Sequence, residues 1–244
     1  MAGERAVRYR PPSTACPGAG VAPALAGVIE LVGPAGAGKT TLARVLASDP
    51  GTSIGLDTGR LRSAAGLAST LPWLTEARFS SRGRFWSRDE LRSLAYLTGW
   101  PSDPSLRDGA GLSVLDHGPV FRLASLCVHG PPMASTPAFA QLWQRLARQW
   151  SGLLDAVVWL DAPDDVLLAR ITGRNRPHRI RGAVPSHARR FLDGYRTAYR
   201  ATLAEVATGP CRLIELDTAT CSPQALAERV RVEVTASPSR RQPR

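Results

Sequence analysis

The sequence predicts an α/β fold in which helices cover both faces of a parallel sheet. Short apolar runs alternate with segments of helical spacing at least five times, and several of the runs end in a polar residue. Repeated alternation of this kind is typical of parallel sheets, in which a helical crossover follows each strand. The runs that we expect to form strands span 27–32, 52–57, 111–116, 155–161 and 211–217.

Helices are predicted from apolar spacing and from capping residues at their first positions. Ser87 and Glu90 form a capping box, which predicts a helix near 88–98. Three more helices are expected to begin at the capping residues Thr136, Asp164 and Ser222. The other segments of helical spacing are 39–48, 119–128 and 186–207.

The ends of the expected strands indicate where a ligand would bind. Parallel strands end at one edge of their sheet, and α/β sheets bind ligands there. Four glycine or aspartate residues fall at such ends, namely Gly33, Asp57, Asp116 and Asp161. We expect Asp161 to be a structural turn residue that acts with Asp164.

Composition bounds the domain organisation. The length of 244 residues suits one α/β domain. We predict a disordered tail over 1–24, one domain over 25–236 with an insertion over 58–110 and a lid over 170–186, and a basic tail over 237–244.

The four cysteines show no metal-binding spacing, which favours free thiols in a reducing compartment. No apolar run is long enough to span a membrane, so we expect a cytoplasmic protein without a membrane partner.

The net charge of +11 raises nucleic acid as a partner. Many of the arginines lie in the two tails, however, and this distribution weakens that interpretation. Lys39 is the only lysine in the chain. Its placement within a glycine-rich segment therefore carries more information than the overall charge does.

That segment, "GPAGAGKTT" over 33–41, fits the pattern G-x-x-x-x-G-K-[ST] without a mismatch. Glycines let the backbone turn its N–H groups inward, where side chains would block a phosphate. Lys39 would reach the β- and γ-phosphates of ATP, and the Thr40 hydroxyl would be a ligand of Mg²⁺. The residues expected to bind the nucleotide are Gly33, Pro34, Ala35, Gly36, Ala37, Gly38, Lys39, Thr40 and Thr41.

Motifs elsewhere narrow the class of P-loop protein. The chain has no N-K-x-D segment for reading guanine and no L-S-G-G-Q segment of transporter ATPases. Four segments resemble the P-loop nucleoside and nucleotide kinases, in particular thymidylate kinase and the deoxyribonucleoside kinases. They are "LDHGP" at 115–119, "VVWLDAPDDVLLARITGRNRPHR" at 157–179, "RRFLDGYRTAYRATLAEV" at 189–206 and "CRLIELDTATCSPQALAERV" at 211–230.

The resemblance covers about 27–57 and 111–235. It implies a three-layer P-loop NTPase fold with a five-stranded parallel sheet of order 2-3-1-4-5, an arginine-rich lid, and ATP as phosphate donor. Where these kinases place an arginine after strand 3, this chain has His117. Phosphoryl transfer needs positive charge around the transferred group, which arginines of a lid supply. The resemblance favours Arg170 and Arg174 as catalytic residues, with Arg176 next as a nucleotide contact; the alternative for any one of them is a solvated basic loop.

The acidic candidates keep two interpretations each. Asp57 is either the base that accepts a proton from the attacking hydroxyl or a loop residue that caps the next helix. Asp116 either holds Mg²⁺ or binds the acceptor, and its alternative role is structural. The candidate catalytic carboxylates are Asp57 and Asp116. The candidate metal ligands are Thr40 and Asp116.

The region 58–110 lies outside the resemblance and is expected to cover the acceptor. Five aromatic residues of this region could stack on the flat ring of an acceptor, but packing in the core is favoured for each of them. They are Trp73, Phe79, Phe85, Trp86 and Trp100. Arg60 and Arg62 are candidates for binding an acceptor phosphate. The prediction is an ATP-dependent kinase acting on a nucleoside, nucleotide or other small hydroxyl compound. The alternative is a P-loop ATPase acting on a protein or nucleic-acid partner, and the oligomeric state stays open.

Overall fold

The computed structural model describes residues 26–55, 68, 85–102, 111–174 and 178–236. Asp57, Arg60, Arg62, Trp73, Phe79 and Arg176, and both predicted tails, lie outside these ranges. The described strands form a five-stranded, all-parallel sheet of order β2-β3-β1-β4-β5, which confirms the predicted order. The strands are β1 (Gly27–Val32), β2 (Thr52–Ile54), β3 (Leu112–Asp116), β4 (Ala156–Asp161) and β5 (Arg212–Asp217).

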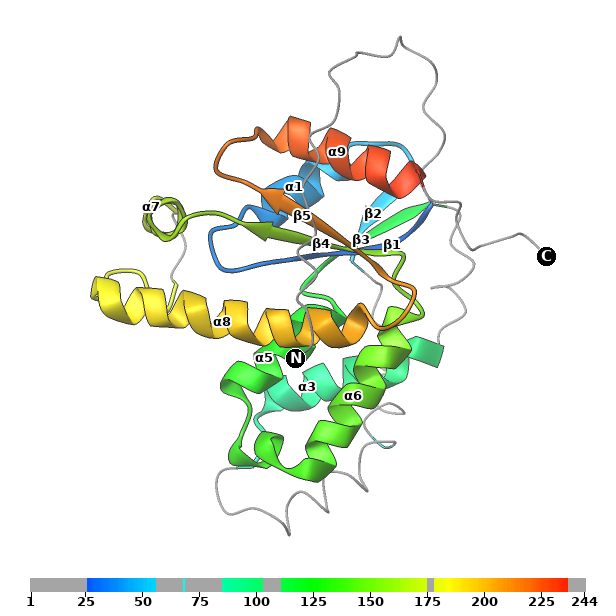
Figure 1. Ribbon diagram of the computed structural model, residues 1–244, viewed down its shortest axis with the longest axis vertical. Coiled ribbons are helices and arrows are strands. Elements are labelled where there is room, and N and C mark those ends of the chain that lie inside the picture. The colour runs from blue at the N-terminus through cyan, green and yellow to red at the C-terminus, as the bar shows by residue number, and fades with distance from the viewer. Residues whose placement is uncertain (1–25, 56–67, 69–84, 103–110, 175–177, 237–244) are drawn as a thin grey trace, which may run out of the picture.

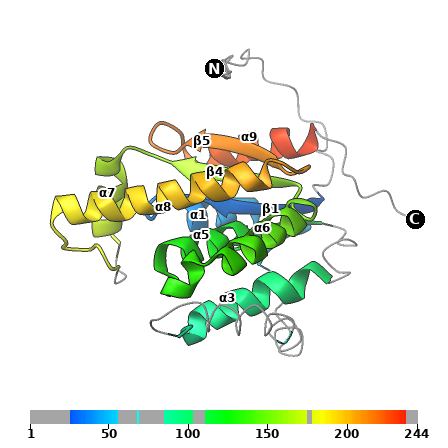
Figure 2. The ribbon, with the colours of Figure 1, turned by 60° about the horizontal axis from the view of Figure 1, so that its bottom comes forward.

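Seven α-helices are described around this sheet. They are α1 (Lys39–Leu46), α3 (Arg88–Gly99), α5 (Pro119–His129), α6 (Pro137–Ser151), α7 (Asp164–Thr172), α8 (Pro185–Val206) and α9 (Pro223–Thr235). Two short 3-10 helices span Trp100–Ser102 and Pro132–Ser135. α1 and α9 pack together on one face, whereas α5, α6 and α8 cover the other, with α3 outside α5 (Figures 1 and 2).

Side-chain caps begin three of the helices where the sequence predicts them. Ser87 Oγ accepts a hydrogen bond from the Glu90 backbone N–H at 3.3 Å, and Glu90 returns one to the Ser87 N–H at 2.7 Å. Thr136 and Ser222 cap α6 and α9 in the same way. The prediction for Asp164 is wrong: Pro163 is the N-cap of α7, and the Asp164 carboxylate instead pairs with Arg196.

The larger part of the core fills the space between the sheet and the helices α3, α5, α6 and α8. Trp150 is wholly buried there. Its ring stacks on that of Tyr96 with 5.6 Å between the ring centroids, and its Nε1–H donates a hydrogen bond of 2.9 Å to the Leu97 carbonyl oxygen. Trp86 and Trp100 are buried in the same cluster, which confirms the core interpretation for these two residues. Phe85, in contrast, is 53% exposed.

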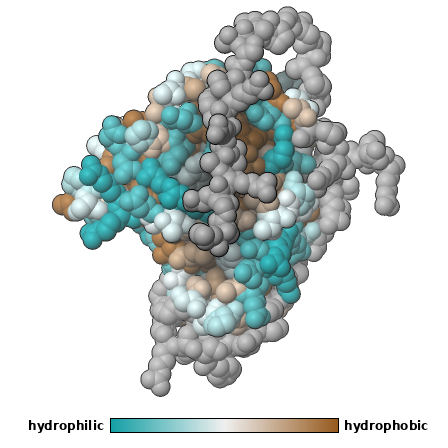
Figure 3. All heavy atoms as spheres, in the orientation of Figure 1, coloured by the Kyte–Doolittle hydropathy of each residue, from teal (hydrophilic) through white to brown (hydrophobic). Residues whose placement is uncertain are grey.

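The outer surfaces carry most of the charge. Figure 3 shows hydrophilic side chains gathered over α7 and α8, where Arg189, Arg190 and Arg200 are exposed. Among the described residues, none of the helices is both long enough and apolar enough to span a bilayer.

We expect the substitution Trp150→Ala to lower the free energy of unfolding by about 3–5 kcal/mol, because it leaves a large cavity and removes the bond to Leu97. Denaturation by guanidinium chloride measures this change. Val232→Ala, at a position that is 57% exposed, is the control and should change it by less than about 0.5 kcal/mol. Equal effects of the two substitutions would contradict this account of the core.

Candidate phosphate-binding and transfer site

The P-loop connects the end of β1 to the start of α1 and lies against β4 and α7. Gly33 and Gly36 have positive φ angles of 142° and 88°. A Cβ atom on Gly33 would clash with the carbonyl group of Leu160, and one on Gly36 would lie 2.6 Å from the carbonyl oxygen of Leu167. Only glycine fits at these two positions, so the loop conformation is fixed by steric contact with its neighbours.

Lys39 lies at the first position of α1 and folds back over the loop. Its ammonium group donates hydrogen bonds to the carbonyl oxygens of Gly33 at 2.7 Å and Pro34 at 3.0 Å. Burial lowers the pKa of Lys39 to about 8, while the nearby Asp116 carboxylate acts in the opposite direction. A buried cation with this low pKa gains most from an anionic ligand, because a phosphate would replace the lost hydration.

Thr40 and Asp116 meet beside the lysine. The Thr40 hydroxyl donates to Asp116 Oδ2 at 2.8 Å. Asp116 Oδ1 is buried and has no hydrogen-bond partner, although His117 Nδ1 lies 3.5 Å away. A hydroxyl and a carboxylate with an unsatisfied oxygen are suitable ligands for Mg²⁺, which usually keeps phosphate oxygens and waters as its other ligands. Among the described residues no group of three His, Cys, Asp or Glu side chains could hold a metal ion alone.

His117 directly follows Asp116, the last residue of β3. It has a positive φ of 67°, and its ring lies edge-on to Phe121 at 4.4 Å. Burial lowers the pKa of His117, an effect that Asp116 opposes and that the positive charges of Lys39 and Arg122 increase. His117 is therefore less readily protonated than a free imidazole.

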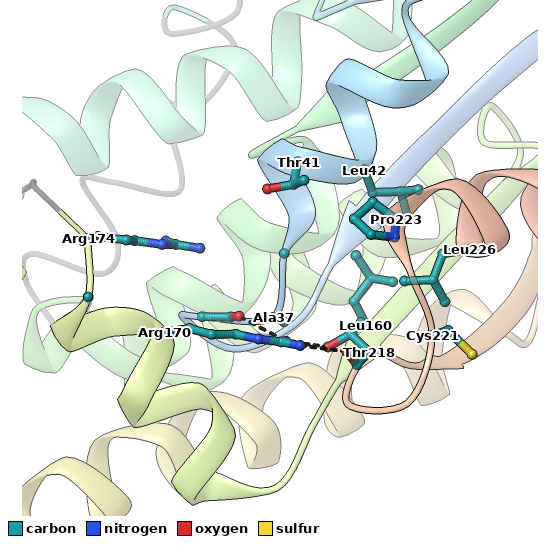
Figure 4. Close-up of a pocket in the computed structure, with 13 residues that line it drawn as sticks. Ala37, Thr41, Leu42, Leu160, Arg170, Arg174, Thr218, Cys221, Pro223 and Leu226 are labelled. Carbon is teal, nitrogen blue, oxygen red and sulfur yellow. Dashed lines mark hydrogen bonds between the residues drawn. The ribbon is translucent and has the colours of Figure 1, made fainter.

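α7 and the turn after it contribute Arg170 and Arg174. Arg170, on α7, donates to the Thr218 hydroxyl at 2.8 Å and to the Thr218 carbonyl oxygen at 2.6 Å. Both arginines line a pocket of about 440 Å³ that extends from the P-loop to the start of α9. Figure 4 shows their side chains facing this pocket from the α7 side. The other lining residues are Gly36, Ala37, Gly38, Thr41, Leu42, Leu160, Gly173, Thr218, Cys221, Pro223 and Leu226.

The carboxylate of Asp161, at the end of β4, is held by hydrogen bonds within the fold. Arg196 of α8 donates to both of its carboxylate oxygens, at 2.9 and 3.1 Å, and to Asp164 at 2.6 Å. These hydrogen bonds raise the pKa of Arg196 above its usual value. Asp161 also accepts a bond from the Ala162 N–H at 2.8 Å, in keeping with the expected turn.

Glu30, in the middle of β1, was not among the predicted site residues. It is wholly buried, and its two carboxyl oxygens accept hydrogen bonds from the N–H groups of Val120 at 2.8 Å and Phe121 at 2.9 Å. A Cβ atom on Gly118 would lie 2.7 Å from the carboxyl carbon of Glu30, so the approach requires glycine at that position. Burial raises the pKa of Glu30 to about 8, against the effect of the two N–H groups.

The structure thus brings Lys39, Thr40 and Asp116 into one cluster, and places Arg170 and Arg174 across a pocket from the P-loop. Sequence reasoning missed Thr218, Glu30, Arg122 and Arg196. A signal for Thr218 exists, because it directly follows β5 at the ligand-binding edge of the sheet. The partners of the other three lie far away in the sequence, and no local pattern identifies them.

No protein-family model matches the sequence, and no curated protein matches it. Solved structures do resemble it. They include deoxyadenosine kinase from M. mycoides with bound dCTP, at a TM-score of 0.46 and 13% identity, over 86% of this chain and all of that chain. The same kinase with bound dATP has a TM-score of 0.49 and 12% identity, over 86% of this chain and 100% of that chain.

A third similar structure is the YorR protein from Bacillus subtilis in complex with phosphorylated GDP. It has a TM-score of 0.48 and 16% identity, over 85% of this chain and 95% of that chain. The assignment of the fold rests on this chain alone. Its five-stranded parallel sheet has the order β2-β3-β1-β4-β5, and its P-loop follows the central strand β1, which together define a P-loop kinase fold.

The raised pKa of Glu30 predicts a pH-dependent stability. The folded protein holds the proton up to about pH 8, whereas the unfolded chain releases it near the ordinary value of 4.5, so this group makes stability fall between pH 4.5 and 8. We expect the free energy of unfolding of Glu30→Gln to increase relative to that of wild type across this range, by about 4 kcal/mol.

Urea denaturation at several pH values from 4.5 to 8.5 measures the difference between the two proteins. Glu215→Gln, at an exposed position on β5, is the control for loss of one carboxylate. If the stability difference between Glu30→Gln and wild type were constant over the whole range, Glu30 would have an ordinary pKa in the fold.

Proposed function

We propose that this protein is a phosphotransferase that moves the γ-phosphate of ATP, with Mg²⁺, to a hydroxyl group of a small acceptor. The acceptor is a nucleoside, a nucleotide or another hydroxyl metabolite. The observation that carries the proposal is the cluster of Lys39 with the Thr40–Asp116 pair at the P-loop, beside a pocket that neighbouring P-loop residues line together with Arg170 and Arg174. Phosphoryl transfer depends on positioning and on positive charge at this kind of site.

Each residue then has a definite role. The P-loop N–H groups and the start of α1 bind the phosphates of the donor. Lys39 turns from its carbonyl partners toward the β- and γ-phosphates. Arg170 and Arg174 neutralise charge that develops on the transferred group, since a guanidinium matches two phosphate oxygens at once. Bound Mg²⁺, held through Thr40 and Asp116, would supply further neutralisation of the phosphate charge.

The pocket at the lid side accommodates the base of the donor. Its floor combines the apolar side chains of Leu42, Pro223 and Leu226 with the polar groups of Thr218 and Arg170. Such a mixture of apolar surface and a few polar groups is typical of small-molecule sites. Asp57 stays a proposed general base, and the segment 170–186 a proposed lid that excludes water.

The experiment that tests the function measures release of ADP from Mg²⁺-ATP against a panel of nucleosides, nucleoside monophosphates, hydroxy acids and oligonucleotides. We expect release that depends on one class of small acceptor and that falls by at least 100-fold in Lys39→Ala, which removes a transition-state contact. Arg148→Gln, on the exposed side of α6, is the control for loss of one positive charge.

ADP release that is steady without any small acceptor and increases with a protein or an oligonucleotide would contradict the phosphotransferase. That result would support the alternative of a P-loop ATPase.

The low pKa of Lys39 predicts that ATP binding weakens as the pH rises above about 8. Bound phosphates raise the pKa of the ammonium group, so binding takes up a proton there, and affinity falls by up to about tenfold per pH unit. Calorimetric titration at pH 7 to 9.5, in buffers with different heats of ionisation, measures both effects. Lys39→Met should bind weakly without this proton uptake; the same uptake in the variant would show that another group is responsible.

A further inference from the structure

Arg122 lies in the first turn of α5, the helix that begins just after Asp116. Its backbone N–H donates to the Gly118 carbonyl oxygen at 3.1 Å, so it belongs to the same turn that Glu30 holds in place. Side chains of a helix tilt toward its N-terminus. The Arg122 side chain is therefore directed back toward the edge of the sheet where phosphoryl transfer would occur.

The guanidinium group of Arg122 is held by α3. Its central carbon lies 4.2 Å above the Tyr96 ring, and one terminal nitrogen lies 3.3 Å from the Ser93 hydroxyl. The Nε atom is buried and has no hydrogen-bond partner. Two groups of α3 thus fix the orientation of the side chain, while part of its hydrogen-bonding capacity stays unused.

No carboxylate among the described residues forms an ion pair with Arg122. The nearby carboxyl group of Glu30 has a pKa of about 8 and is mostly protonated at pH 7, and the pKa of Tyr96 is raised, so its ring is neutral. Burial lowers the pKa of Arg122 itself. A half-buried cation without a counter-charge, such as Arg122, gains from a ligand that supplies the charge.

The position of Arg122 separates it from the donor pocket. In the sheet, β3 and β4 lie on opposite sides of β1. The pocket with Arg170 and Thr218 lies on the side of β4 and β5, whereas α5 follows β3. His117, which directly follows Asp116, packs its ring edge-on against Phe121, the residue before Arg122.

Resting on the proposed function, we propose that Arg122 is a specificity-determining residue that binds an oxyanion of the acceptor. Its unsatisfied Nε and its position on the β3 side of the P-loop carry this inference. The acceptor then has a hydroxyl group that attacks the γ-phosphate and, apart from it, a phosphate or carboxylate that pairs with the guanidinium. A guanidinium suits this task because it forms two parallel hydrogen bonds to either group.

The test uses matched pairs of acceptors that differ only in the anion: deoxynucleoside monophosphates against deoxynucleosides, and glycerate against glycerol. Binding to the full chain in the presence of Mg²⁺-ADP is measured by calorimetric titration, and phosphorylation by ADP release. The variants are Arg122→Gln and, as the control for loss of one positive charge, Arg148→Gln.

We expect wild type to prefer one anionic member over its neutral partner by at least tenfold. Arg122→Gln should lose this preference through the dissociation constant and KM, and Arg148→Gln should keep it. The pair that shows the preference distinguishes phosphate from carboxylate. A purely structural role of Arg122 would lower the affinity for charged and neutral members alike, and that result would overturn the inference.

Equal binding of both members of every pair by wild type would also overturn it, even if neutral acceptors were phosphorylated and the proposed function held. Binding of an anionic member that depends on Arg122, without any phosphorylation, would support the oxyanion site and contradict the proposed function. The two failures are therefore distinguishable.

Discussion

Glu30 lies in the central strand β1, has no contact with solvent, and still satisfies two N–H groups at the start of α5. The first N–H groups of a helix have no partner within the helix, so a buried helix start needs an acceptor from elsewhere. Glu30 supplies it and joins the strand before the P-loop to the helix after β3. Asp116, His117 and Arg122 all lie within this connection, so their positions relative to Lys39 depend on that one carboxyl group.

The side of the site near α7 has its own connections, and arginines make them. Arg196 joins α8 to the end of β4 through Asp161 and Asp164, and Arg170 joins α7 to the residue after β5 through Thr218. Arg196 is satisfied by carboxylates, whereas the partners of Arg170 among the described residues are all neutral oxygen atoms. The difference matters because a cation already paired with two carboxylates gains little from a phosphate, while one bonded to a hydroxyl and a carbonyl oxygen keeps its charge available.

The sequence predicted the parts of this site that depend on local pattern. The apolar runs located all five strands, and the P-loop motif located Lys39 and Thr40, because the motif specifies backbone shape as well as side chains. The meeting of Thr40 and Asp116 followed from the common edge of parallel strands. The sheet order required the resemblance to P-loop kinases, since alternation of strands and helices does not determine it.

The sequence did not predict the long-range partners. Glu30 and Val120 are separated by 90 residues, and an acid inside an apolar strand gives no sign of the helix that it caps. Asp164 satisfied a local rule for capping, yet a guanidinium from α8 binds its carboxylate more strongly than a backbone N–H would. The many arginines of the chain look alike in sequence, and only their partners distinguish structural from functional ones.

The two sides of the P-loop therefore differ in chemistry. The side of β4 and β5 offers a pocket with apolar walls and an arginine that is bonded to neutral oxygens. The side of β3 offers a half-buried guanidinium that is oriented by a ring and a hydroxyl. Under the proposed function, the first side would take the donor and the second side the acceptor. Because the Nε atom of Arg122 has no hydrogen-bond partner, its guanidinium is suited to an anionic group on the acceptor.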